Sequence, residues 1–128
     1  MRNLIREVGP LPRSGNTDLY RSLMRAIVGQ QLSVKAAGTI WLRFAALFSS
    51  GYPDARQVLE TDVSLLRGAG LSFQKAGYLR NIAEFSIRQT LDYGKLRAMQ
   101  DEDLIEYLTQ IKGVGKWTAE MILMFSLG

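Results

Sequence analysis

The apolar residues of this chain recur at helical spacing in short segments, which glycine, proline and helix-capping residues separate from one another. Leu19, Leu23 and Ile27, for example, follow Asp18, whose carboxylate suits the N-cap of a helix. No stretch alternates apolar and polar residues over the length of a strand beside a hairpin turn. The pattern therefore predicts an all-α domain, a bundle of about seven short helices.

Capping residues and breaks set the expected boundaries. Residues 1–16 contain two prolines and two glycines and are expected to form an N-terminal lead-in, with the helical domain over residues 17–128. Asp92 and Gly94 mark a turn, and the last helix is apolar nearly all round and is expected to be buried. The helices are expected from Asp18 to about Gly29, Ser33 to about Phe48, Asp54 to about Leu59, Thr61 or Asp62 to Leu66, Ser72 to about Gln89, Asp101 to Ile111, and Lys116 to Phe125.

The chain contains no histidine and no cysteine, which excludes several kinds of chemistry. Without cysteine there is no disulfide, iron–sulfur cluster, thiolate zinc site or cysteine nucleophile. Without histidine there is no imidazole base and no histidine-ligated metal. Proton transfer within this chain must therefore use carboxylates, tyrosine, lysine or water.

The net charge and the hydropathy of the chain indicate which kinds of partner it can bind. The formal net charge of +4 permits a nucleic-acid partner without requiring one. The longest stretch without a charged residue, residues 44–53, has ten residues, which is too short to span a bilayer. We therefore expect no membrane partner.

The sequence Lys112-Gly113-Val114-Gly115 joins two apolar helices by a very short turn. The first N–H groups of the second helix, from Gly115 to Thr118, then have no partner within that helix. Free N–H groups at a helix N-terminus bind anions such as phosphate, and Lys112 and Lys116 add positive charge. The alternative is a plain hairpin of two helices, in which the glycines serve only the tight turn.

Three segments of the chain carry a more specific pattern: YRSLMRAIVGQQLSVKAA at residues 20–37, LRGAGLSFQKAGYLRNIA at 66–83 and LTQIKGVGKWTAEMIL at 108–123. Together and in this order they resemble the helix-hairpin-helix base-excision DNA glycosylases, specifically the 3-methyladenine DNA glycosylase II (alkyladenine) branch. The resemblance covers more than a third of the chain. It implies the endonuclease III-like fold, with a helix-hairpin-helix motif that holds the DNA backbone without reading sequence.

The resemblance assigns two sets of binding residues to the hairpin. The residues implied in binding DNA phosphate are Gly113, Gly115, Lys116 and Thr118. Main-chain carbonyl groups are implied to hold a monovalent cation, Na⁺ or K⁺, and these belong to Thr109, Ile111 and Val114. No other cofactor is required, in keeping with a chain that has no histidine or cysteine.

Gln31 and Trp117 are the remaining site residues that the resemblance implies. Gln31 would be the wedge that fills the gap left by a flipped nucleotide; alternatively, the Gln30–Gln31 pair is solvated and precedes the Ser33 cap. Trp117 stands where strand-cleaving relatives have a nucleophilic lysine, so the resemblance implies a monofunctional enzyme that uses water. Its indole would stack on a positively charged alkylated base, the alternative being a core tryptophan. Trp41 is expected in the core.

The catalytic aspartate of the family lies further along the chain than the position of Trp117, and no aspartate follows Trp117 here. We therefore expect that residue beyond Gly128, in a fold that lacks its C-terminal helices and is inactive by itself. The implied activity is hydrolysis of the N-glycosidic bond of alkylated purines flipped out of double-stranded DNA, by a monomer located in the bacterial cytoplasm or the eukaryotic nucleus. Two alternatives are a non-catalytic helix-hairpin-helix module that binds duplex DNA, and a helical interaction domain.

Overall fold

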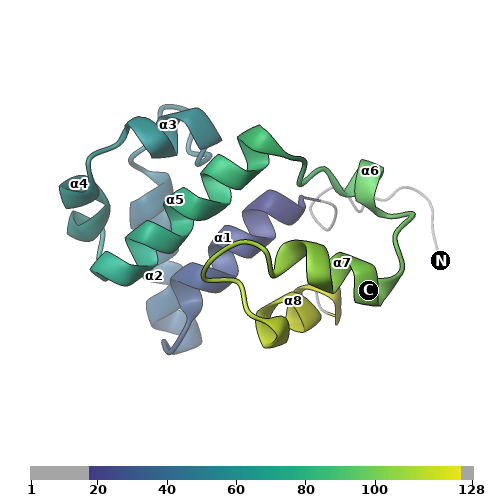
Figure 1. The fold of residues 1–128 in the computed structure, drawn as a ribbon. Helices are drawn as coiled ribbons and strands as arrows, with labels where there is room; N and C mark the ends of the chain where they lie inside the picture. The colour runs from purple at the N-terminus through teal and green to yellow at the C-terminus, as the bar shows by residue number, and fades with distance from the viewer. Residues whose placement is uncertain (1–17, 125–128) are drawn as a thin grey trace, which may run out of the picture.

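The computed structural model describes residues 18–124, which form eight helices and no strand (Figure 1). This confirms the all-α prediction for these residues, while the expected lead-in at residues 1–16 lies outside them. No helix among residues 18–124 is both long and apolar enough to cross a membrane. The helices are α1 (Leu19–Gly29), α2 (Val34–Ala45), α3 (Ala55–Glu60), α4 (Val63–Gly68), α5 (Phe73–Arg88), α6 (Tyr93–Leu96), α7 (Asp101–Leu108) and α8 (Lys116–Ile122).

Short-range caps start the helices where the sequence predicts. The Asp18 carboxylate accepts the Arg21 N–H at 3.0 Å, at the start of α1. The hydroxyl groups of Ser33 and Ser72 accept the N–H three residues further on, at 3.1 and 3.0 Å, at the starts of α2 and α5. Each cap satisfies an N–H group that has no partner within its helix.

The structure differs from the prediction by one additional helix and by earlier ends of α2 and α7. The one-turn helix α6 forms where a turn was expected, because the Asp92 carboxylate accepts the Gly94 N–H at 2.9 Å, and the count is therefore eight rather than seven. Helix α2 ends at Ala45 rather than near Phe48, and α7 ends at Leu108 rather than at Ile111, although Phe48 and Ile111 are both buried.

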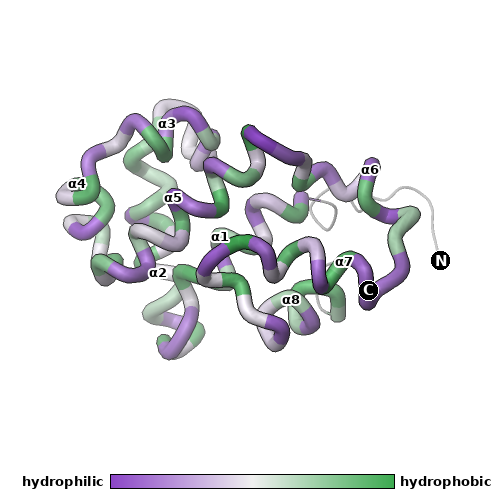
Figure 2. Tube along the Cα trace, in the orientation of Figure 1, coloured by the Kyte–Doolittle hydropathy of each residue, from purple (hydrophilic) through white to green (hydrophobic). Residues whose placement is uncertain are grey.

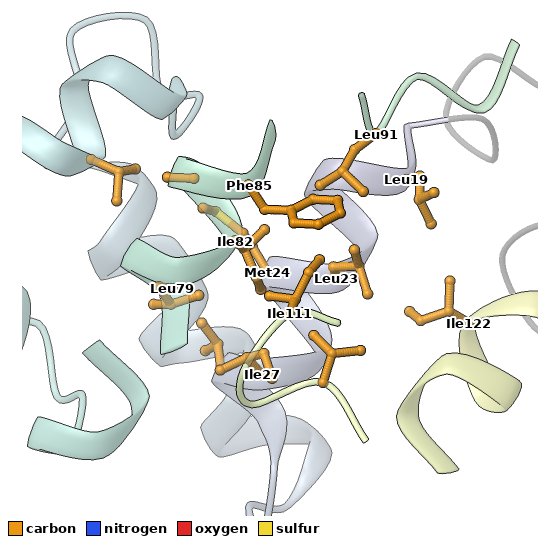
Figure 3. Close-up of a cluster of buried hydrophobic side chains, with 14 of the residues drawn as sticks. Leu19, Leu23, Met24, Ile27, Leu79, Ile82, Phe85, Leu91, Ile111 and Ile122 are labelled. Atoms are coloured by element: carbon orange, nitrogen blue, oxygen red, sulfur yellow. The ribbon is translucent and has the colours of Figure 1, made fainter. Parts of the chain in front are cut away.

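Helix α1 lies at the centre of the fold and packs against α2, α5 and α8, while α5 also packs against α3 and α4 (Figure 1). Apolar side chains of α1 and α5 form the central part of the core together with Leu91, Ile111 and Ile122 (Figure 3). Hydrophobic and hydrophilic residues alternate along the helices rather than gathering in one of them (Figure 2). Each helix therefore buries one face and exposes the other.

Two tyrosines hold the start of α1 against residues 52–54. The Tyr20 hydroxyl donates to the Pro53 carbonyl at 2.6 Å, and the Tyr52 hydroxyl donates to the Asp18 carboxylate at 2.9 Å. Burial raises the pKa of both Tyr20 and Tyr52 well above the usual range, so both hydroxyl groups remain donors even at a pH at which a free tyrosine ionises. The first turn of α1 is thereby fixed, and the other end of the same helix carries the candidate site.

The two tryptophans differ in their burial. Trp41 is 4% exposed and lies in the core, as expected. The prediction that the last helix is buried is wrong for one of its faces, because Trp117 is 71% and Met124 69% exposed. Helix α8 packs on α1 and α7 through one face only, with Thr118, Ala119 and Ile122 buried. The alternative of a core tryptophan at position 117 is therefore wrong as well.

Candidate nucleic-acid interface and base pocket

Residues 109–115, called the hairpin below, connect α7 to α8 by a tight turn that only glycine permits at position 113. The Val114 N–H donates to the Ile111 carbonyl at 2.9 Å, and Gly113 has φ +107°. A Cβ built at Gly113 would overlap the Tyr78 ring of α5, because it would lie only 2.6 Å from the ring atom Cδ1. Both the backbone conformation and the neighbouring ring therefore exclude a side chain there.

Gly115, by contrast, faces open space. It has φ −87°, which any residue adopts, and a Cβ built on it meets no atom within 4 Å. The first backbone bond of α8 runs from the Ala119 N–H to the Gly115 carbonyl at 3.0 Å. The N–H groups of residues 116–118 therefore have no hydrogen-bond partner within residues 18–124.

Two lysines place positive charge beside the hairpin. Lys112 and Lys116 are both exposed and flank the hairpin. A bound anion could therefore meet free N–H groups, positive charge and a position without a side chain.

The three carbonyl groups implied in cation binding differ in their hydrogen bonds. The Ile111 carbonyl accepts the Val114 N–H, whereas those of Thr109 and Val114 accept no bond from the described residues. Carbonyl oxygens suit a hard cation and can take a second partner, so this donor set fits Na⁺ or K⁺. No group of three or more acidic, histidine or cysteine side chains within residues 18–124 is placed to hold a metal ion.

A cavity of about 480 Å³ lies between the end of α1 and the start of α8. Gln31 and Trp117, predicted separately as wedge and base-stacking residue, both line it, and we call it the Gln31–Trp117 cavity. None of the described residues that line it is charged. They are Ala26, Gly29, Gln30, Gln31, Leu32, Trp117, Thr118 and Met121.

The segment that presents Gln31, residues 30–33, has an unusual backbone. Gln31 is exposed and has φ +62°, a left-handed conformation that is uncommon for a residue with a side chain. The Leu32 N–H donates to the Gly29 carbonyl at 3.1 Å, and Ser33 then caps α2. This segment, called the Gln31 loop below, is thus a tight connection with Gln31 at its exposed tip.

Residues of α5 that the sequence did not indicate support the Gln31 loop and the hairpin. The Lys75 ammonium of α5 donates to the carbonyls of Val28 and Gln30, at 2.9 and 2.6 Å. The Asn81 side chain donates to the Lys112 carbonyl at 3.1 Å. A spacing of three places Lys75, Tyr78 and Asn81 on one side of a helix, but the loops that they reach depend on how α5 packs.

The model of the HhH-GPD superfamily of base excision DNA repair proteins matches residues 24–126 of the chain. DNA-3-methyladenine glycosylase 1 of Schizosaccharomyces pombe is 40% identical over 110 residues, which are 84% of this chain and 48% of that protein. An alkylbase DNA glycosidase-like protein of the same organism is 34% identical over 131 residues, covering 98% of this chain and 62% of that protein.

Two solved structures of 3-methyladenine DNA glycosylases are also similar to this chain. The 3-methyladenine DNA glycosylase of S. pombe in complex with abasic DNA matches with a TM-score of 0.83 at 38% identity, covering 93% of this chain and 59% of that chain. A DNA-3-methyladenine glycosidase from Bacillus halodurans matches with a TM-score of 0.79 at 40% identity, covering 87% and 51%. The chain thus spans about half the length of most of these relatives.

Proposed function

Because the chain belongs to the HhH-GPD superfamily of base excision DNA repair proteins, we propose that it binds duplex DNA and accepts a flipped alkylated purine in the Gln31–Trp117 cavity. The reaction would be that of a monofunctional DNA N-glycosylase. One observation carries the proposal: Gln31 and Trp117 line the same cavity, and that cavity adjoins the first turn of the helix that follows the hairpin. A wedge, a stacking surface and a phosphate site are therefore close together.

The hairpin would hold the DNA backbone. The free N–H groups of residues 116–118 supply donors, Gly115 lets a phosphate approach, and Lys112 and Lys116 attract it. A Na⁺ or K⁺ ion held by the carbonyls of the hairpin would add positive charge beside the same phosphate. None of these contacts reads a base, so affinity should depend little on sequence.

The Gln31–Trp117 cavity would receive the base. A purine alkylated on a ring nitrogen carries positive charge, and an indole face attracts a cation by about 0.5 to 2 kcal/mol. The exposed Gln31 side chain would occupy the space that the flipped nucleotide leaves. Trp117 cannot act as a covalent nucleophile, so water would attack the sugar.

Hydrolysis also needs a group that stabilises the cationic sugar and orients the water, for which a carboxylate is suited. The described residues that line the cavity include no carboxylate. We therefore expect the catalytic carboxylate from a segment outside residues 18–124, in line with its expected place beyond Gly128.

Duplex binding and base release test the proposal. Affinity for undamaged duplex should fall with salt, with a slope of log K against log salt concentration of about −2 if Lys112 and Lys116 each neutralise one phosphate. Release of alkylated purines from methylated DNA should be absent with this chain. It should appear when the chain is extended by any residues that follow Gly128 in its reading frame.

Three results would contradict parts of the proposed function. Affinity that is absent, or present but independent of salt, would favour a helical interaction domain. Binding without base release from either form would favour a non-catalytic module that binds duplex DNA, an alternative that the uncharged lining of the cavity supports. Release by the 128-residue chain itself would overturn the expected place of the carboxylate.

The Gln31→Gly variant distinguishes the proposed wedge role of Gln31 from its effect on the stability of the Gln31 loop. Glycine adopts φ +62° without strain, which offsets its greater entropy in the unfolded chain, so the free energy of unfolding should be unchanged or rise by up to about 1 kcal/mol. Preference for duplex containing an abasic-site analogue over intact duplex should nevertheless fall, because the side chain that fills the gap is gone. Urea denaturation and competition binding measure the two effects. Retained preference would show that Gln31 is not the wedge.

A further inference from the structure

One side of α5 touches the backbone of both segments that are proposed to contact DNA. Lys75, Tyr78 and Asn81 follow one another at intervals of three residues along this helix. Lys75 reaches the end of α1, Tyr78 lies against Gly113, and Asn81 reaches Lys112. The α5 stripe, as we call these three residues, therefore spans the distance between the Gln31 loop and the hairpin.

Lys75 holds the end of α1 with a single charged group. Its ammonium donates to the carbonyls of Val28 and Gln30, on either side of Gly29 and directly before Gln31. The carbonyls at a helix C-terminus have no intrahelical partner and carry partial negative charge, which an ammonium neutralises. Lys75 is partly buried, and desolvation lowers the pKa of its ammonium.

The other two residues hold the hairpin. Tyr78 occupies the space that a Cβ at Gly113 would need, and Asn81 donates to the carbonyl of the preceding residue. These contacts position the turn that precedes the free N–H groups of α8. None of the three residues of the stripe lines the Gln31–Trp117 cavity.

We propose that the α5 stripe sets the spacing between the Gln31 loop and the hairpin, with Lys75 as the positioning residue for Gln31. A wedge can enter the base stack only if its loop lies at the correct distance from the phosphate that the hairpin holds. A left-handed residue such as Gln31 keeps its conformation only where neighbouring contacts enforce it. The two bonds from Lys75 to carbonyls beside the loop provide that restraint.

Amide hydrogen exchange of the DNA-free chain tests the positioning role without reference to DNA. In Lys75→Met, exchange at the Leu32 amide should become faster by about tenfold or more, as expected when a charged hydrogen bond is lost. Exchange at the Val114 amide of the hairpin should change much less. Lys95→Met is the matched control, because Lys95 is an exposed lysine on α6 and its loss changes the net charge equally.

Three further variants keep this test decisive. Lys75→Arg retains charge and donors and should recover part of the protection at Leu32. Asn81→Ala should show the reverse pattern, with faster exchange at Val114 and little change at Leu32. If Lys75→Met does not fold, Lys75→Gln provides the same comparison. Equal acceleration across the whole chain, or none at Leu32, would overturn the positioning role.

Binding to DNA tests the link to Gln31, and this part rests on the proposed function. Lys75→Met should lower the preference for duplex with a tetrahydrofuran abasic analogue over intact duplex by about tenfold, while its affinity for intact duplex should match that of Lys95→Met. In a Gln31→Ala background, Lys75→Met should cause no further loss of preference. An equal loss in both backgrounds would overturn the proposal. If the unsubstituted chain shows no preference at all, the proposed function fails, and the exchange result still decides the positioning role.

Discussion

Gly113→Ala is expected to lower the free energy of unfolding by about 2–4 kcal/mol. The backbone at this position has φ +107°, which strains any residue with a side chain. The added Cβ would also lie 2.9 Å from the Tyr78 Cβ, which rotation of the ring cannot move, because the buried Leu79 and Ile82 fix the position of α5. Urea denaturation of the chain would measure the loss. In a domain of this size it corresponds to a melting temperature lower by about 7–15 °C.

Gly115→Leu is the matched control for that variant, because the two glycines flank the same valine. Gly115 has an ordinary φ and open space around it, so the cost in stability should be at most about 1 kcal/mol, from a poorer N-cap. Its affinity for duplex DNA should nevertheless fall by about tenfold or more, because the side chain occupies the path of the phosphate. Unchanged affinity would refute the phosphate site, and an equal loss of stability in both variants would refute the distinction between them.

Trp117→Ala is expected to reduce release of alkylated purines by about five- to thirtyfold, since stacking and cation–π attraction are worth roughly 1–2 kcal/mol. Trp117 is 71% exposed, so its removal should change the free energy of unfolding by less than about 1 kcal/mol. The rate is measured on methylated DNA with whichever form of the chain releases base in the assay above.

Two variants accompany the Trp117→Ala measurement. Trp117→Phe keeps an aromatic face and should retain part of the activity. Leu42→Ala removes a side chain that is similarly exposed, at 69%, on α2 and outside the Gln31–Trp117 cavity, and should leave release unchanged. Normal release by Trp117→Ala would show that this indole is not the stacking surface. A large loss of stability would show instead that it supports the fold.

The helices that the sequence predicted correctly are those with a local signal. Asp18, Ser33 and Ser72 each cap a helix through an N–H three residues away, so the contact is encoded within one turn. Helix α6 was missed because four residues are too few to show a hydrophobic period. The burial predicted for α8 holds for one face only, because an apolar sequence does not reveal that Trp117 lies at the exposed start of the helix.

The candidate site likewise combines features that the sequence predicts with features that only the tertiary structure shows. The hairpin was recognisable from residues 108–123, since its N–H groups and its tight turn depend on neighbours within a few residues. Gln31 and Trp117 were each proposed from resemblance to a family, but nothing in the spacing of these residues indicated that they share a cavity. The contacts of Lys75 were not predicted, because its two hydrogen-bond partners lie 45 and 47 residues away in the chain.

The sequence by itself determined the all-α class, the helix caps and the glycine turn, because such features depend on contacts between residues within about one helical turn. It presented Gly113 and Gly115 as equivalent. Only the tertiary structure distinguished them, by placing Tyr78 of α5 against the first and open space beside the second. It likewise decided that the end of α1 meets the start of α8, since the direction in which each helix packs is set by the shared core and not by its own sequence.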